Sequence, residues 1–243
     1  MKVLVTGASK GIGRAIALQL QHKYELILHA STDASLDGIW HELETRDRHH
    51  RLSADFSDTE AVKVFCTSLK KQFSDSLYAV INNAGITLDK SLIFQPERDI
   101  NKLIQVNLKA PIIITRTALK IFHGRKKGVV INMSSCVGEM GNAFQSVYAA
   151  TKAGLVAFSK SLAREAGALA PDHRIRVLSV SPGYIETSMT DKIPESSKTI
   201  YMDNIPSKRM GQPNEVAALI MYLLSEEAGY INGSEIKING GIV

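Results

Sequence analysis

Residues 3–13 read VLVTGASKGIG, and this stretch decides the fold. Its first three residues are apolar, as in a buried strand, and the apolar positions of residues 12–21 follow a helical period. The glycines at positions 7, 11 and 13 permit a tight turn between the two elements. A helix that begins directly after such a turn presents free backbone N–H groups to a pyrophosphate. The G-x-x-x-G-x-G spacing departs from the G-x-G-x-x-G fingerprint, but its place between the first strand and the first helix predicts a dinucleotide site.

Outward from this stretch, short apolar strands alternate with helical stretches along the whole chain. Further strands are expected at residues 26–28, 51–53, 78–81, 128–133, 175–180 and 235–238. Between them we expect a polar helix through residue 40, a helix at 60–73, a long helical region through 119, a helix at 147–168 and another after Pro213. This alternation predicts an α/β fold, a doubly wound parallel sheet with helices on both faces. No linker or repeat divides residues 1–243, so we expect a single domain that binds the dinucleotide and carries the catalytic groups.

The composition excludes several classes of protein. The net charge is +5, but the basic residues are dispersed and their densest cluster, residues 124–128, is too short to indicate nucleic acid binding. The longest apolar stretch, residues 217–224, is far shorter than the ~20 residues that span a bilayer. The two cysteines lack CxxC spacing and no room for a signal peptide precedes Thr6, so we expect a cytoplasmic protein with reduced thiols. The histidines lack a metal-ligand pattern, and no metal site is expected.

Tyr148 and Lys152 stand four residues apart in a helical stretch, so their side chains share one face. A free tyrosine has a pKa near ~10, and a nearby cation favours the phenolate, so we expect the pKa of Tyr148 to be lowered. Lowering it to about 7 requires roughly 4 kcal/mol, at about 1.4 kcal/mol per unit. One lysine does not supply that much, and an oxidised nicotinamide ring is expected to add a second positive charge. The pair predicts proton transfer during a redox reaction.

The end of the second strand indicates which nicotinamide dinucleotide is bound. An acidic residue there would bind the ribose hydroxyls of NAD and repel a 2′-phosphate. Here the strand leads into Ser31 and Thr32, and Lys10 can face the phosphate, although Asp33 follows closely and argues the other way. The pattern favours NADP(H).

With these residues laid out, the chain resembles the short-chain dehydrogenase/reductase family over essentially its whole length. The matching elements are residues 6–13, Asp55, residues 82–85, Asn107, Ser135, Tyr148, Lys152, Pro182-Gly183 and Thr187. Within the family the chain is most similar to the β-ketoacyl-acyl carrier protein reductases, on residues 82–90, 138–142, 182–190 and 230–233. The resemblance implies a Rossmann-type fold and the NADPH-dependent reduction of a 3-oxoacyl thioester in fatty acid or related acyl-chain synthesis.

The resemblance also implies roles for particular residues. Tyr148 would be the acid, Lys152 would hold its pKa low and bind the nicotinamide ribose, and Ser135 would donate to the carbonyl oxygen, with Ser134 left open as an alternative. Asn107 would hold a water that relays protons to Lys152, whereas an isolated asparagine within a helix is more often solvated. Asp55 would accept from the adenine amino group or would cap a helix. Residues 194–210 would form a polar lid over the substrate. The implied cofactor-binding set is Gly7, Ser9, Lys10, Gly11, Ile12, Gly13, Ser31, Thr32, Asp55, Phe56, Asn83, Ala84, Gly85, Tyr148, Lys152, Pro182, Gly183, Ile185 and Thr187.

The expected partners follow from the same resemblance. An acyl carrier protein would dock near the mouth of the active site on Lys126 and Arg174. A homotetramer is expected, with the helices around Asn107 and Tyr148 at one interface and the C-terminal strand at another. Reduction of acyl-CoA thioesters or of free ketones remains an alternative, as does a non-catalytic NADP-binding protein, against which the complete set of four catalytic residues argues.

Overall fold

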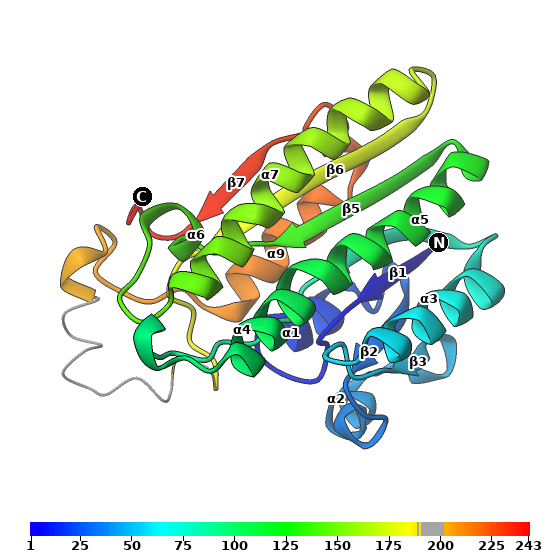
Figure 1. Cartoon of the computed structure of the whole chain (residues 1–243). Coiled ribbons are helices and arrows are strands. Elements are labelled where there is room, and N and C mark those ends of the chain that lie inside the picture. Colours follow the sequence, from blue (N-terminus) through cyan, green and yellow to red (C-terminus); the bar gives the residue numbers. More distant parts are fainter. Residues whose placement is uncertain (189, 191–201) are drawn as a thin grey trace.

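The structure of the chain, a computed structural model, describes residues 1–188, 190 and 202–243. Its centre is a seven-stranded parallel sheet with the strand order β3-β2-β1-β4-β5-β6-β7 (Figure 1). The predicted α/β fold with a parallel sheet is therefore confirmed. The strands are β1 (Lys2–Val5), β2 (Glu25–Ala30), β3 (His50–Ser53), β4 (Leu77–Asn82), β5 (Lys127–Met133), β6 (Arg174–Pro182) and β7 (Glu235–Ile238).

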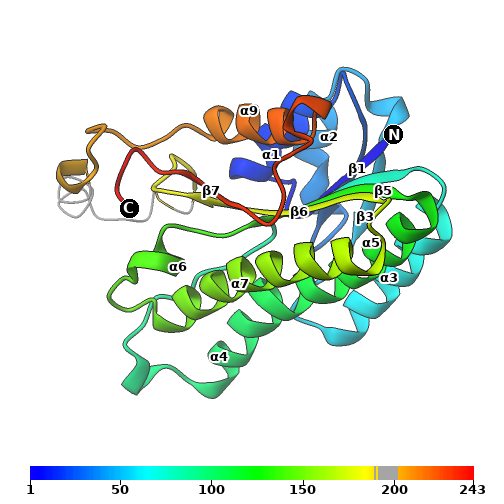
Figure 2. The ribbon, with the colours of Figure 1, turned by 90° about the horizontal axis from the view of Figure 1, so that it is seen from above.

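Helices cover both faces of the sheet, as expected for a doubly wound fold (Figure 2). One face carries α1 (Gly11–Leu20), α2 (Asp37–Glu42) and α9 (Pro213–Leu223), and the other carries α3 (Thr59–Phe73), α4 (Glu97–Ile104), α5 (Ala110–Arg125) and α7 (Ser146–Leu169). The short elements are η1 (Ala34–Leu36), η2 (Arg46–Arg48), η3 (Leu92–Phe94), α6 (Val137–Met140), η5 (Glu226–Ala228) and a π-helical turn, η4 (Gln105–Lys109).

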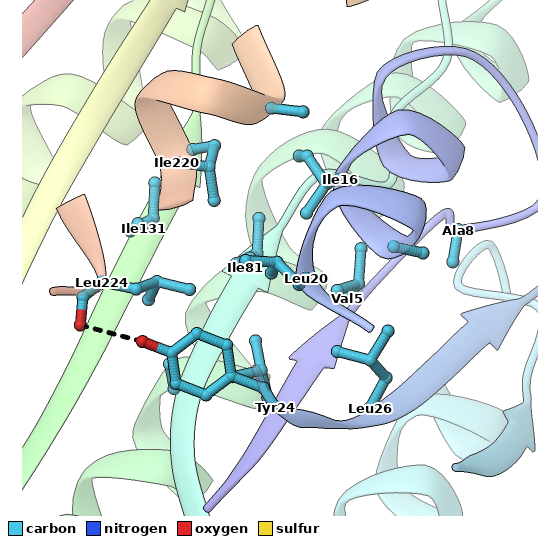
Figure 3. Close-up of a cluster of buried hydrophobic side chains, with 14 of the residues drawn as sticks. Val5, Ala8, Ile16, Leu20, Tyr24, Leu26, Ile81, Ile131, Ile220 and Leu224 are labelled. Atoms are coloured by element: carbon cyan, nitrogen blue, oxygen red, sulfur yellow. Dashed lines mark hydrogen bonds between the residues drawn. The ribbon is translucent and has the colours of Figure 1, made fainter. Parts of the chain in front are cut away.

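Successive side chains of the strands enter two different cores. On β1, Val3 and Val5 pack with residues of α1 and α9, while Leu4 packs with residues of α3 and α5 on the opposite face. Figure 3 shows part of the first core, in which Val5 lies near Ile16 of α1. Both sides of each central strand are buried, and this explains why the strands read as continuous apolar runs.

The helices differ from the sequence-based expectation in two places. The long helical region ends not at residue 119 but at Arg125, and the π-helical turn η4 interrupts it between α4 and α5. The polar helix expected through residue 40 is instead the single turn η1 followed by the six-residue α2. Short helices are marginal by themselves, so tertiary contacts decide where these helices begin and end.

The order of the strands leaves a crevice at the carboxyl ends of β1 and β4. From β1 the chain proceeds to β2 and β3 on one side, and it then returns to place β4 on the other side of β1. Because the two connections leave the sheet on opposite sides, neither covers the strand ends between them. In open α/β sheets, ligands bind where the strand order reverses in this way. In the part of the chain described here, no helix is long and apolar enough to cross a bilayer.

Candidate active site

The glycine turn after β1 fits a closely bound anion. Gly7 and Gly11 have positive φ angles of 66° and 55°, which glycine adopts without strain. A Cβ atom on Gly13 would lie 2.1 Å from the carbonyl oxygen of Gly7, so only glycine lets α1 pack this closely against the turn. The first turn of α1 contains no acidic residue, and its free N–H groups form a positive helix terminus. The turn therefore has the shape and the polarity that a dinucleotide pyrophosphate requires.

Asn83 and Thr6 hold this turn against the end of β4. The Asn83 side-chain amide donates to the carbonyl oxygens of Thr6 at 2.9 Å and of Gly7 at 3.2 Å. The Thr6 hydroxyl oxygen accepts from the backbone N–H groups of Asn83 at 2.9 Å and of Ala84 at 3.0 Å. The preceding Asn82 does not face the pocket, because its side chain is buried between Thr115 and Asn132.

His29, to which sequence reasoning assigned no role, supports the turn from below. Its Nδ1 accepts from the Gly7 N–H at 3.3 Å, and its Nε2 donates to the Ala54 carbonyl at 3.0 Å. Burial lowers the pKa of His29 to about 4, which keeps the ring neutral and Nδ1 free to accept. The ring also stacks on Phe56 with a centroid distance of 3.9 Å. Only the pairing of β1, β2 and β3 brings these residues together, so the sequence contains no local signal for this contact.

Most of the predicted cofactor residues line one pocket at the carboxyl ends of the strands. Those that line it are Gly7, Ser9, Lys10, Gly11, Ile12, Asn83, Ala84, Gly85, Tyr148, Lys152, Pro182 and Thr187. Met133, Ser134 and Ser188 line it too, and the cofactor prediction did not include them. The predicted cofactor residues that do not line this pocket are Gly13, Ser31, Thr32, Asp55, Phe56, Gly183 and Ile185.

Lys152 and Tyr148 do lie on the same face of α7. The Lys152 ammonium is 5.6 Å from the centroid of the Tyr148 ring and donates to the Met133 carbonyl at 2.8 Å. Lys152 is only 5% exposed, and its burial lowers its pKa to about 8.

The expected lowering of the Tyr148 pKa is wrong for the polypeptide by itself. Burial raises the pKa of Tyr148 to about 12, and a hydrogen bond with Ser135 opposes this increase only in part. Desolvation of the phenolate is the largest cause of this increase, and the Lys152 ammonium, which was expected to oppose it, is directed towards the Met133 carbonyl. Tyr148 therefore carries its proton at neutral pH, as an acid in a reduction must.

The contacts of the two adjacent serines favour Ser135 over Ser134 as the donor to a substrate oxygen. The Ser134 hydroxyl is buried and donates to the Lys152 carbonyl at 2.8 Å, so it is already engaged. The Ser135 hydroxyl accepts from the Val137 N–H at 3.2 Å and is hydrogen-bonded to Tyr148. Its half-buried position beside the phenol allows both groups to meet one oxygen atom.

Asn107 lies in the π-helical turn η4 and is fully buried, so the solvated alternative is wrong. Its Oδ1 accepts from the Ile86 N–H at 2.9 Å, and its Nδ2 donates to the Ile86 carbonyl at 2.9 Å. A Cβ on Gly85 would lie 3.4 Å from both Asn107 Oδ1 and Lys152 Nζ, so the two polar groups meet beside Gly85. Single π turns inside helices often mark functional sites. The water between Asn107 and Lys152 stays a prediction.

Ser31 and Thr32 follow β2 at the end of the crevice where the adenosine of a dinucleotide would lie, and both are exposed. The neighbouring acid, Asp33, is paired with Arg51 of β3. Arg51 Nε and Nη2 contact the two carboxylate oxygens of Asp33 at 3.0 and 2.8 Å, and Nη2 also contacts Asp37 at 2.8 Å. The guanidinium carbon lies 5.5 Å from the centroid of the Trp40 ring, which adds a cation–π contact. The Asp33 carboxylate, which argued against NADP(H), is thus paired with a guanidinium that it shares with Asp37.

Asp55 and Phe56 follow β3 at the edge of the crevice. Asp58, and not Asp55, caps α3, because its Oδ1 accepts from the Glu60 N–H at 2.8 Å. The helix-capping alternative for Asp55 is therefore wrong, and its Oδ1 accepts instead from the Ser57 N–H at 2.9 Å, a bond that lowers its pKa. The Phe56 ring belongs to the core beside His29, so only its backbone can meet a cofactor.

The segment after β6 closes the other side of the pocket. A Cβ on Gly11 would lie 3.3 Å from the methyl group of Thr187, so Thr187 sits directly over the glycine turn. Ile185 is buried and pairs in a parallel bridge with Gly211, and a Cβ on Gly183 would meet the Asn239 backbone at 2.8 Å.

The predicted lid falls partly outside the described residues, which omit 194–201. Its last residues are fixed to the rest of the protein. The Ser207 N–H donates to the Gly240 carbonyl at 3.1 Å, and Arg209 forms an ion pair with Glu215 at 2.6 Å.

Lys126 and Arg174 lie together but away from this pocket. The Arg174 N–H donates to the Lys126 carbonyl at 2.8 Å, and Arg174 is the first residue of β6. Both residues therefore occupy the amino ends of the strands, opposite to the end that carries Tyr148. The expectation that they flank the mouth of the active site in the same chain is wrong, because parallel strands place their starts and their ends at opposite edges.

Comparisons with known proteins agree with this geometry. The family model described as "Enoyl-(Acyl carrier protein) reductase" matches residues 7–243. The chain is 38% identical to nodulation protein G of Rhizobium sp., covering 99% of this chain and 96% of that protein. It is 36% identical to the (3R)-3-hydroxyacyl-CoA dehydrogenase of Rattus norvegicus, with coverages of 98% and 95%. Its identity to the 3-oxoacyl-(acyl-carrier-protein) reductase of Haemophilus influenzae is 35%, with coverages of 98% and 96%. A glycine turn, a buried lysine and a protonated tyrosine in one pocket, together with these full-length matches, identify the chain as an oxidoreductase of the short-chain dehydrogenase/reductase family that acts on CH–OH groups.

Proposed function

We propose that this enzyme uses NADPH to reduce a 3-oxoacyl thioester to the 3-hydroxyacyl thioester, with the acyl group carried by an acyl carrier protein. The observation that carries the proposal is the cluster of Tyr148, Ser135 and Lys152 beside the glycine turn. The 35% identity to a 3-oxoacyl-(acyl-carrier-protein) reductase over nearly the full length supports this substrate class.

The pocket residues fit a nicotinamide dinucleotide. Gly7 and Gly11 adopt the positive φ angles of the turn and Gly13 lets α1 pack against it, and the pyrophosphate would bind at the start of α1. Thr187 stands over the turn, and Lys152 lies near Gly85, where a ribose could accept from the ammonium. When bound, the reduced nicotinamide supplies a hydride to the carbonyl carbon.

Side chains of the protein stabilise and then protonate the oxygen atom of that carbonyl. Ser135 donates a hydrogen bond to the oxygen as negative charge develops on it. Tyr148 then transfers its proton to the oxygen, which completes the alcohol. The Lys152 ammonium stabilises the phenolate that remains, and a solvent proton restores the tyrosine. Asn107 holds the Ile86 backbone and thereby keeps Gly85 beside Lys152.

A comparison of substrates tests the proposal. The purified protein would be given NADPH with acetoacetyl-carrier protein, acetoacetyl-CoA or ethyl acetoacetate, and the loss of nicotinamide absorbance would be followed. We expect kcat/KM to be highest for the carrier-bound thioester and lowest for the free ester. The similarity to a (3R)-3-hydroxyacyl-CoA dehydrogenase favours the CoA thioester as the second candidate. A higher kcat/KM for acetoacetyl-CoA would select that candidate, and turnover of the free ester alone would reject both.

The preference for NADPH is expected to depend on Arg51. Arg51→Gln leaves the Asp33 carboxylate unbalanced beside Ser31 and Thr32, where the 2′-phosphate would bind, so the KM for NADPH should rise about tenfold. The KM for NADH should change little, because NADH has no phosphate at that position. The double variant Asp33→Asn/Arg51→Gln should recover most of the NADPH affinity. A wild-type preference for NADH would contradict the assignment of NADPH as the cofactor. An equal increase of both KM values in Arg51→Gln would also contradict it.

We also propose a cytoplasmic homotetramer. Ile104, at the end of α4, and Tyr230, before β7, are exposed apolar side chains near the two expected interfaces. Sedimentation velocity should give four times the mass of one chain, and a monomer at micromolar concentration would refute the proposal.

A further inference from the structure

Phe144, in the loop between α6 and α7, combines a strained backbone with an exposed aromatic side chain. Its φ angle is 67°, a left-handed conformation that bulky residues rarely adopt, and its side chain is 64% exposed. Of the described residues other than glycine, only Lys126 and Lys208 share a positive φ. Lys126 ends a helix, where this conformation is common, and both lysines are hydrophilic. Neither helix capping nor burial in the core accounts for Phe144.

The strained conformation is held by groups other than the phenyl ring. The Phe144 carbonyl accepts from the Lys90 N–H at 2.9 Å. The Gln145 side-chain amide donates to the two carboxylate oxygens of Asp89 at 3.0 and 2.9 Å, and Asn142 donates to Gln145 Oε1 at 3.0 Å. The loop after β4 and the loop before α7 are therefore fixed to each other, and the ring projects from the joint without any part in holding it.

This joint lies beside the catalytic tyrosine. Phe144 precedes Tyr148 by four residues, and the start of α7 and α6 lie at the carboxyl end of the sheet (Figure 1). Met140 of α6 and Ile93 and Phe94 of η3 are exposed apolar residues on the same two connected loops, with Ile93 82% exposed. Strain and exposed apolar groups are both unfavourable in an isolated protein, and strained residues cluster where a ligand is bound.

We infer that Phe144 receives the apolar tail of the acyl substrate and sets a preference for chains longer than four carbons. The inference rests on the proposed function, since it names which part of the thioester this loop contacts. The tail is the apolar part of such a substrate, whereas the arm on the other side of the thioester is rich in amides. The backbone that carries the ring is already held by the contacts of the two loops, so less freedom is lost when the tail packs on it. Each methylene buried against it should raise kcat/KM about fourfold.

The test compares Phe144→Gly with Leu169→Ala, a matched control that removes an 80% exposed apolar side chain at the far end of α7. Both full-length variants and the wild type would be assayed with NADPH and the CoA thioesters of 3-oxobutanoate and 3-oxooctanoate. We expect Phe144→Gly to lower kcat/KM for the eight-carbon substrate at least tenfold, through KM, and to leave the four-carbon substrate within twofold. Its Tm should not fall, because glycine adopts the left-handed conformation without strain. Leu169→Ala should not change kcat/KM for either substrate.

An equal effect of Phe144→Gly on both substrates, or no effect on either, would overturn the inference. Titration of decanoyl-CoA into the same proteins, followed by calorimetry, separates this inference from the proposed function. Weaker binding to Phe144→Gly alone would support the role of Phe144 even if the wild type reduced neither thioester. Unchanged binding together with normal turnover would refute the role of Phe144 and leave the proposed function standing. Phe144→Asn, which also tolerates a positive φ, should repeat the result of the glycine variant.

Discussion

Tyr148→Phe is expected to lower the turnover number by a factor of about 10² to 10⁴, the usual contribution of a positioned general acid. The variant keeps the ring and its packing but removes the only ionisable proton of that side chain. The affinity for NADPH, measured by the change in nicotinamide fluorescence, should stay within about twofold of the wild type. Single-turnover rates of 3-oxoacyl thioester reduction would provide the measurement.

The matched control is Tyr78→Phe, which removes a buried hydroxyl elsewhere in the fold. The Tyr78 hydroxyl donates to the Leu224 carbonyl at 2.8 Å, so its loss should cost about 1 kcal/mol of stability and leave turnover unchanged. The turnover of Ser135→Ala should lie between those of Tyr148→Phe and Tyr78→Phe, since this variant loses one hydrogen bond to the substrate carbonyl oxygen. If Tyr148→Phe kept more than a tenth of wild-type turnover, the acid would have to be another group.

Lys152→Met is expected to abolish most activity while making the protein more stable. The pKa of Lys152 falls from 10.5 to about 8 because its ammonium is buried. At pH 7 the lysine is protonated in both the folded and the unfolded protein, so the folded state bears the whole desolvation cost of about 3 kcal/mol. Methionine has a similar length and no charge, and the free energy of unfolding at pH 7 should rise by up to this amount. Turnover should fall at least 100-fold, because no cation remains to stabilise the Tyr148 phenolate.

The pH dependence of the stability and of the turnover follows from the pKa of Lys152. Above pH 8 the folded protein loses the Lys152 proton before the unfolded chain does, so the stability gap between variant and wild type should narrow up to about pH 10.5. Wild-type reduction should decline as the pH rises through about 8, since the ammonium is neutralised. Chemical denaturation at pH 7 and pH 10, with a pH–rate profile, would measure both effects. A Lys152→Met variant that is less stable than the wild type at pH 7 would contradict this account of the buried charge.

Much of the fold could be predicted from the sequence, because it follows from local periodicity. The apolar runs at residues 78–81 and 128–133 correspond to β4 and β5, whose two faces are both buried. The break in the helical region before Ala110 could not be predicted, because the π-helical turn there is stabilised by contacts of Asn107 with a distant loop. Helix propensity alone gives no sign of such an interruption.

For the candidate site too, some features could be predicted from the sequence and others could not. Tyr148 and Lys152 share a helix face because of their spacing, and the glycines of residues 7–13 form a turn because of their own conformational freedom, so the sequence by itself determined both features. Only the tertiary structure decided that burial raises the pKa of Tyr148, that Arg51 pairs with Asp33 and that His29 supports Gly7. The physical reason is range: the shared helix face and the glycine conformations depend on neighbours within a few residues. Desolvation and charge pairing depend instead on which distant segments the sheet brings together.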